Sequence, residues 1–232
     1  MALCAIKDME AIIVFDMDGV LAEVTESYRE AIVQTVEHFT GKRIQRDLIQ
    51  DYKNQGGWNN DWSLSQKIAG DLGVEIPYDI VVNYFNEIFI GPNHGDGLIQ
   101  REQWFPKPGL LERLRERFGL AIFTGRLQYE AEITLKRFAP NCTFDPLLCA
   151  EHVHKAKPDP EGLLYIQRLN PSRKLWYIGD TVDDARSARA AGVPFIGIAA
   201  HNHSRRDEIL RLFQQEQAVA VFENVNEIEN AL

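Results

Sequence analysis

Two aspartates separated by one residue follow a short apolar run near the start of the chain. The run Ala11–Phe15 leads directly into Asp16-Met17-Asp18-Gly19. In such a pair, one carboxylate can attack an electrophile while its neighbour transfers a proton. The glycine permits a sharp turn, so the two carboxylates can face each other across a small space. A solvated turn is the simpler interpretation of an isolated Asp-x-Asp motif, because aspartate is common in turns.

Two more polar clusters follow apolar positions later in the chain. Thr124 and Gly125 follow the run Leu120–Phe123, where a helix is expected to begin. A hydroxyl and a glycine amide at a helix start suit anion binding, although a hydroxyl there also serves as a helix cap. Lys157 is followed by Pro-Asp-Pro, and these prolines restrict the backbone direction around it. Most lysines are surface charges, so its place between a strand end and a helix start makes it a candidate.

A last cluster holds three carboxylates, Asp180, Asp183 and Asp184, directly after the run Leu175–Ile178. Carboxylate oxygens are hard ligands of the kind that octahedral Mg²⁺ prefers. Together with the first two aspartates, this cluster predicts a magnesium site.

The apolar runs have the length and the β-branched or aromatic content of buried strands in a parallel sheet. Further strands are expected at Pro146–Cys149 and Pro194–Ile198. Helical periodicity predicts helices over Leu110–Phe118, Leu127–Phe138, Glu161–Leu169, Asp184–Ala191 and Arg205–Phe213. From residue 105 onward we therefore expect a doubly wound α/β fold, in which ligands bind at the carboxyl ends of the strands.

The segment between the first two strands has a different character. It contains almost no strand signal, but amphipathic helical patterns occur at Ser27–Phe39, Leu64–Leu72 and Tyr78–Phe89. A loop after Val20 and the glycine-rich stretch Gly91–Gly97 bound this segment. The predicted architecture is an α/β core formed by residues 1–21 and 105–232, with an inserted α-helical cap at residues 22–104.

Composition excludes several classes of protein. The formal net charge of −9 argues against a nucleic-acid partner. The three cysteines, Cys4, Cys142 and Cys149, cannot all pair, and without a CxxC motif they indicate a reducing, intracellular setting. A polar start at Met1–Glu10 and the lack of an 18-residue apolar stretch predict a soluble cytoplasmic protein without a membrane partner. The oligomeric state is open.

The four motifs, in this order, resemble those of the haloacid dehalogenase-like (HAD) superfamily of hydrolases. The helical insertion resembles the cap of subfamily I, which includes phosphoglycolate phosphatase and β-phosphoglucomutase, and the resemblance covers essentially the whole chain. It implies that Asp16 is the nucleophile that forms an aspartyl-phosphate. It implies that Asp18 is the general acid/base, and an acid at this position argues against a dehalogenase.

The resemblance also implies roles for the later motifs. Thr124 and Gly125 would hold the phosphoryl oxygens, and Lys157 would neutralise both the nucleophile and the phosphoryl group. Asp180 would bind the Mg²⁺ cofactor together with the first two aspartates, and Asp184 would orient the lysine or metal-bound water. The role of Asp183 is open. This set is coherent, because phosphoryl transfer needs in-line positioning and neutralised negative charge.

The cap is expected to select the substrate, since the core motifs engage only the phosphoryl group. The stretch Lys53–Trp62 combines amides, tryptophans and paired glycines, and Lys53, Asn59 and Asn60 are the candidate substrate contacts. A capped helix start with core tryptophans explains the stretch equally well. Arg126 is a further candidate contact, for an anionic group, and a surface ion pair explains it equally well.

These observations favour a Mg²⁺-dependent phosphatase that hydrolyses a small phosphorylated metabolite. A phosphomutase similar to β-phosphoglucomutase is the alternative enzyme, and a non-catalytic phosphate-binding regulatory module is the alternative of another class. Two His-x-His pairs, His152/His154 and His201/His203, are interpreted as loop histidines, because they lack a recognisable metal-site spacing.

Overall fold

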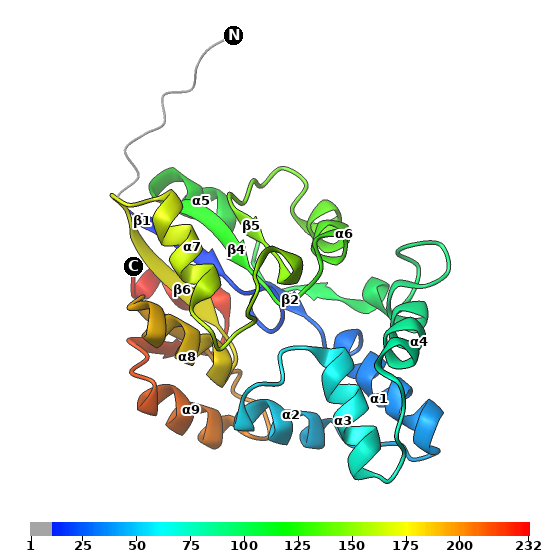
Figure 1. Ribbon diagram of the computed structural model, residues 1–232. Helices are drawn as coiled ribbons and strands as arrows, with labels where there is room; N and C mark the ends of the chain where they lie inside the picture. Colours follow the sequence, from blue (N-terminus) through cyan, green and yellow to red (C-terminus); the bar gives the residue numbers. More distant parts are fainter. Residues whose placement is uncertain (1–10) are drawn as a thin grey trace.

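The computed structural model describes residues 11–232 (Figure 1). The segment Met1–Glu10, with Cys4 and the polar start used in the prediction of a cytoplasmic protein, lies outside the described residues. Within the described part of the chain, no helix combines the length and the apolar character needed to span a membrane.

A six-stranded parallel sheet forms the centre of the larger unit, with the strand order β5-β4-β1-β6-β7-β8. The strands are β1 (Ala11–Phe15), β4 (Gly119–Phe123), β5 (Leu147–Leu148), β6 (Lys174–Gly179), β7 (Phe195–Ile198) and β8 (Ala220–Phe222). The five strands expected from the sequence are present, and β8 is an addition. Strand β1 lies between β4 and β6, so the aspartates that follow it lie near the middle of the sheet edge.

Helices cover both faces of this sheet. Ala11, Ile13 and Phe15 of β1 pack on the face with α5 and α6, while Ile12 and Val14 pack on the face with α7, α8 and α9. This alternation is what a strand buried on both sides requires. The helices are α5 (Leu110–Arg117), α6 (Gln128–Phe138), α7 (Glu161–Leu169), α8 (Val182–Ala191) and α9 (Arg206–Gln215).

Four helices between β1 and β4 pack together and enclose a hydrophobic core of their own. They are α1 (Tyr28–Thr40), α2 (Arg46–Gln55), α3 (Asp61–Asp71) and α4 (Tyr78–Ile90), followed by the short 3₁₀ helix η1 (Leu98–Arg101). We use the name cap for this helical unit. Helix α2 was not expected, because its sequence RDLIQDYKNQ carries only a short apolar stripe.

The chain passes between the sheet and the cap twice, and the two passages lie side by side. They pair as a short antiparallel ribbon of β2 (Ala22–Glu23) and β3 (Gln103–Trp104). The glycine-rich stretch Gly91–Gly97, expected to bound the cap, instead joins α4 to η1. Residues of η1 still pack in the core of the cap, so the return passage comes later.

The cap also meets the sheet unit far from these passages. Helix α2 packs against α8 and α9, as Figure 1 shows at the bottom of the molecule. The cap therefore touches the sheet unit at both ends of the space between them.

Candidate active site

The turn after β1 brings two of the sequence motifs into contact. Gly19 has a φ of 71°, a conformation that glycine adopts without strain. A Cβ built on Gly19 would lie 2.0 Å from Oδ2 of Asp180. The glycine is therefore needed both for the turn and for the close approach of the Asp180 carboxylate.

Lys157 is buried between carboxylates from two different strand ends. Its Nζ lies 3.0 Å from Oδ2 of Asp16 and 2.7 Å from Oδ1 of Asp184. Burial alone lowers the pKa of Lys157, but these two carboxylates outweigh it and raise the pKa above its ordinary value. The hydroxyl of Tyr177 donates to the same Asp184 oxygen, at 2.7 Å. The lysine is thus a fixed positive charge beside Asp16, and Asp184 orients it as expected.

Oxygen atoms of Asp16, Asp180 and Asp184 lie within 4.8 Å of one another. Burial, reinforced by the charge of Asp184, raises the pKa of Asp180 to about 7. Among the described residues, no group donates a hydrogen bond to the Asp180 carboxylate. An unpaired carboxylate beside two others is the donor chemistry that a divalent cation satisfies, so these residues fit the predicted metal.

The side chain of Asp18, which was expected among the metal ligands, turns to Arg126 instead. Its Oδ1 accepts from Nε and Nη2 of Arg126 at 2.8 and 2.6 Å. The same guanidinium donates to Glu102, at 2.8 Å, and to Thr134, at 2.7 Å. The sequence suggested that Arg126 contacts an anionic substrate group or forms a surface ion pair. Both expectations are wrong, because Arg126 is buried and bound to Asp18 and Glu102. Its donors are held by carboxylates of the protein, which also raise its pKa against the opposing effect of burial.

Thr124 and Gly125 lie at the carboxyl end of β4 and line the same cavity as the aspartates. The Thr124 hydroxyl accepts from the backbone N–H of Arg126 at 3.2 Å. Within residues 11–232, no hydrogen bond from the Gly125 N–H to another group is present. That N–H remains available to an anion in the cavity.

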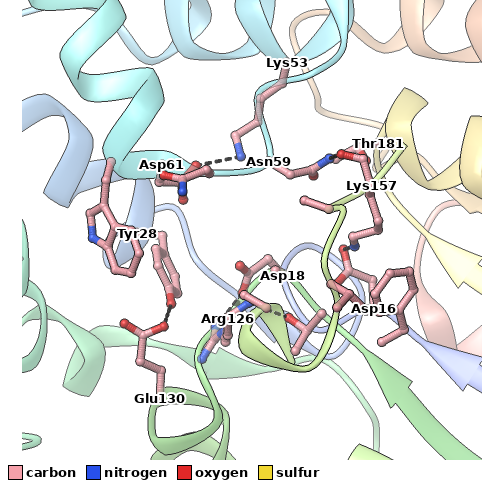
Figure 2. A pocket seen from close by; sticks show the side chains of 18 residues that line it. Asp16, Asp18, Tyr28, Lys53, Asn59, Asp61, Arg126, Glu130, Lys157 and Thr181 are labelled. Carbon is pink, nitrogen blue, oxygen red and sulfur yellow. Dashed lines mark hydrogen bonds and ion pairs between the residues drawn. The ribbon is translucent and has the colours of Figure 1, made fainter. Parts of the chain in front are cut away.

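A cavity of about 110 Å³ separates these side chains from the cap. Figure 2 shows Lys53, Asn59 and Asp61 of the cap on one side, and Asp16 and Asp18 on the other. Nζ of Lys53 pairs with Oδ1 of Asp61 at 2.9 Å, and both side chains line the cavity. Lys53 thus lies where the sequence predicted, but it shares its charge with a carboxylate.

The two asparagines expected to contact the substrate have protein partners. Asn60 caps helix α3, because its Oδ1 accepts from the N–H of Ser63 at 2.9 Å. Its amide also donates to the Tyr78 hydroxyl, at 3.1 Å. Asn59 donates to Oδ2 of Asp183 at 2.8 Å. The capped helix start, the alternative explanation of this stretch, therefore describes Asn60.

Sequence reasoning missed several residues of the cavity wall. Tyr28 and Glu130 line it and share a hydrogen bond of 2.7 Å, while Glu102 lies behind Arg126. Tyr28 lies in the first turn of α1 and is buried. Nothing in the local sequence marks Glu102, because Arg126 lies 24 residues away. Glu130 accepts locally from the N–H of Leu127 at the start of α6, but its bond to Tyr28 spans 102 residues.

The histidine pairs stand apart from this site. His152 accepts from the N–H of Cys149, and His154 pairs with Glu161. The group of three potential ligands found in the described part of the chain contains no histidine. His152 is the last residue of the short 3₁₀ helix η2 (Ala150–His152), whereas His154 lies in a loop. In the second pair, His201 pairs with Glu223 and His203 accepts from the N–H of Arg205.

Comparison with known proteins gives the family. The family model of the haloacid dehalogenase-like hydrolases matches residues 13–198. An imidazoleglycerol-phosphate dehydratase of Phytophthora nicotianae is 32% identical over 80% of this chain, which spans 42% of that relative's length. A phosphorylated carbohydrates phosphatase of Thermotoga maritima is 30% identical over 84% of this chain and 87% of its own.

Solved structures agree on the fold. A haloacid dehalogenase-like hydrolase from Bacteroides fragilis superposes with a TM-score of 0.72 at 22% identity, covering 94% of this chain and 99% of that one. The matched region contains the four strand-end motifs described above. The chain therefore belongs to the haloacid dehalogenase-like hydrolase family and is an enzyme of its phosphatase type.

Proposed function

We propose that this enzyme hydrolyses a small phosphorylated metabolite through an aspartyl-phosphate on Asp16, with Mg²⁺ as its cofactor. One observation carries the proposal: the Asp16 carboxylate lies between the Lys157 ammonium and the carboxylates of Asp180 and Asp184, at the floor of a cavity. A nucleophilic carboxylate with a fixed cation beside it is suited to attack at phosphorus.

In the first step, a carboxylate oxygen of Asp16 forms a bond to phosphorus while the bond to the leaving alcohol breaks. Lys157 offsets the negative charge of the transferring group, and the free N–H of Gly125 and the Thr124 hydroxyl hold its oxygens. Asp18 donates the proton that the leaving oxygen needs. Its Oδ2 is the oxygen without a bond to Arg126 in this structure, so this oxygen is assigned the proton transfer.

In the second step, the same Asp18 oxygen takes a proton from a water molecule that attacks the aspartyl-phosphate. Phosphate leaves and the Asp16 carboxylate is restored. Mg²⁺, held by Asp16, Asp180 and Asp184 at this site, would neutralise phosphoryl oxygens during both steps. Its fit rests on the unpaired Asp180 carboxylate and on the oxygen-only donor set.

The cavity supports a leaving group that is small and polar without a carboxylate. The three cations beside it are Lys53, Arg126 and Lys157, and each is paired with a carboxylate of the protein. A leaving group with hydroxyls can exchange hydrogen bonds with the Lys53–Asp61 pair. The name of the Thermotoga relative, a phosphatase of phosphorylated carbohydrates, is consistent with such a substrate.

Phosphate release from p-nitrophenyl phosphate and from a panel of sugar phosphates, with Mg²⁺ or with excess EDTA, tests the proposal. Asp16→Asn is expected to fold normally and to lose turnover, because the isosteric amide cannot attack phosphorus. Asp79→Asn, an exposed position at the start of α4, is the matched control. Normal hydrolysis by folded Asp16→Asn would remove this residue from the nucleophile role. Isomerisation of a sugar phosphate without phosphate release would instead indicate a mutase.

A further inference from the structure

Asp183 is the one acid of the fourth motif without a place in the proposed chemistry. It lies in the first turn of α8, it is almost fully buried, and its side chain faces the cap. Its Oδ2 accepts from the backbone N–H of Gly57 at 2.7 Å and from Nδ2 of Asn59 at 2.8 Å. Both donors belong to the loop between α2 and α3, more than 120 residues earlier in the chain.

This loop, residues 56–60, is shaped to lie against α8. Gly56 and Gly57 have φ values of 85° and 83°, which favour glycine. A Cβ on Gly56 would lie 2.1 Å from Nη1 of Arg186 and 2.8 Å from Oδ1 of Asp183. The paired glycines thus permit a close contact between the loop backbone and the helix.

The docked loop also reaches the residues proposed for catalysis. Nδ2 of Asn59 donates to the backbone carbonyl of Lys157 at 3.1 Å. The carbonyl oxygen of Asn59 lies 3.4 Å from the position of a Cβ on Gly125. Asn59 and Asn60 line the cavity, and Figure 2 shows Asn59 beside it. One loop therefore bonds to the backbone of Lys157, passes close to Gly125 and lines the cavity that both residues line.

The docked state also carries an energetic cost, which opposes its two hydrogen bonds. Oδ1 of Asp183 is buried without a hydrogen-bond partner in the described residues, and the nearest cation, Nη1 of Arg186, is 3.8 Å away. A buried carboxylate with incomplete pairing carries a desolvation penalty. That penalty opposes docking of the loop. It therefore reduces the free-energy difference between the docked and undocked states below what the two hydrogen bonds alone would give.

We propose that Asp183 is a positioning residue that docks the loop 56–60 of the cap over the active-site cavity and thereby completes the site around Lys157 and Gly125. This inference rests on the proposed function for its effect on turnover, but docking itself can be measured without activity. It assigns Asn59 to the docking contact and not to substrate recognition.

Hydrogen–deuterium exchange of the full chain measures docking directly, through the amides of residues 56–60. Asp183→Ala and Asn59→Ala are compared with Ser204→Ala, which removes a different contact between cap and sheet unit, the 2.8 Å bond to Asp47. We expect loop exchange to rise about tenfold or more in Asp183→Ala, because Gly57 loses its acceptor, and to stay unchanged in Ser204→Ala.

Steady-state kinetics with p-nitrophenyl phosphate and Mg²⁺ provide the second readout. Each of Asp183→Ala and Asn59→Ala should lower kcat/KM about tenfold. The double variant should lose clearly less than the product of the two losses, because either change alone already removes the hydrogen bond between Asp183 and Asn59. Asp183→Asn, which keeps one acceptor oxygen, should fall between wild type and Asp183→Ala in both measurements.

Unchanged loop exchange in folded Asp183→Ala, or losses that multiply in the double variant, would overturn the proposal. If Asp183→Ala does not fold, Asn59→Ala and Asp183→Asn decide in the same way, since Asn59 lies in a loop and Asn conserves the volume of Asp. A wild-type protein that releases no phosphate would defeat the proposed function, while the exchange measurement would still decide the docking.

Discussion

Replacing Arg126 with methionine is expected to leave two carboxylates, Asp18 and Glu102, without the guanidinium that they now share. Arg126 has no exposed side-chain surface, Glu102 has 1%, and Asp18 has 32%. Methionine fills much of the volume of arginine but donates no hydrogen bond. Asp18 can turn to solvent, whereas Glu102 stays buried with only the hydroxyl of Thr134 as a donor.

The size of the effect follows from the burial of Glu102. Removing one partner of a buried ion pair costs about 3–5 kcal/mol, because the other charge is left without compensation. The more exposed Asp18 adds little to this figure, since solvent screens it. For a chain of this length, each kcal/mol lowers Tm by roughly 2–4 °C, so Tm should fall by roughly 6–20 °C. Activity should fall as well, because Asp18 loses the group that fixes its direction.

Urea and thermal unfolding of Arg126→Met measure this cost, and Arg113→Met is the matched control. Arg113 pairs with Glu229 at the surface, so its loss should cost less than about 1 kcal/mol. Adding Glu102→Gln to Arg126→Met should recover a large part of the stability, because it removes the unpaired buried charge. A loss below about 1 kcal/mol for Arg126→Met, or a further loss on adding Glu102→Gln, would refute the reasoning.

Three further outcomes are expected. Asp180→Ala should abolish the Mg²⁺ dependence of turnover or turnover itself, and full activity of the wild type in excess EDTA would contradict the metal site. Asn60→Ala should lower the free energy of unfolding by about 1 kcal/mol, because α3 loses its N-terminal cap. It should change kcat/KM equally for small and large phosphate esters, and a selective loss on the larger ester would show that Asn60 contacts the substrate. Burial raises the pKa of Cys149 to about 12, so its thiol should resist iodoacetamide at pH 8 until the protein is unfolded. Mass spectrometry measures the alkylation, and rapid alkylation of Cys149 in the folded protein would contradict its burial.

Most of the sheet could be predicted, because each long strand is a local apolar run. The elements that escaped prediction depend on distant partners. Strand β8 is only three residues, Ala220–Phe222, and pairs with β7. Strands β2 and β3 have two residues each and exist only as a pair. Their local patterns are too short to carry a signal, so tertiary contacts decide them.

The residues of the candidate site also fall into those with a local sequence signal and those that depend on distant partners. Asp16, Thr124 and Asp180 directly follow β1, β4 and β6, so a short motif contains both the strand and the polar group. Lys157 lies beyond β5 and η2 and was found through its Pro-Asp-Pro sequence. The residues that position them are joined through space: Glu102 meets Arg126, and Asp183 meets Asn59. A single sequence shows each of these as an ordinary polar residue. Even Asn60, singled out correctly as a cavity residue, has a hydrogen-bonding role that depends on where α3 begins.

The charges of the site explain why a cation belongs there. Arg126 forms an ion pair with Asp18 and therefore does not neutralise the three carboxylates of the proposed metal site. The remaining cluster sets Asp16, Asp180 and Asp184 against Lys157 alone. Burial and the neighbouring carboxylates raise the pKa of both Asp16 and Asp180. When all three carboxylates are ionised, as metal binding requires, they exceed the Lys157 ammonium by two negative charges, and an incoming phosphoryl group would add more. Like charges at this separation in a buried site repel strongly. A divalent cation would offset that excess, so the electrostatics of the residues support the proposed Mg²⁺ in the same way as the chemistry of their oxygens does.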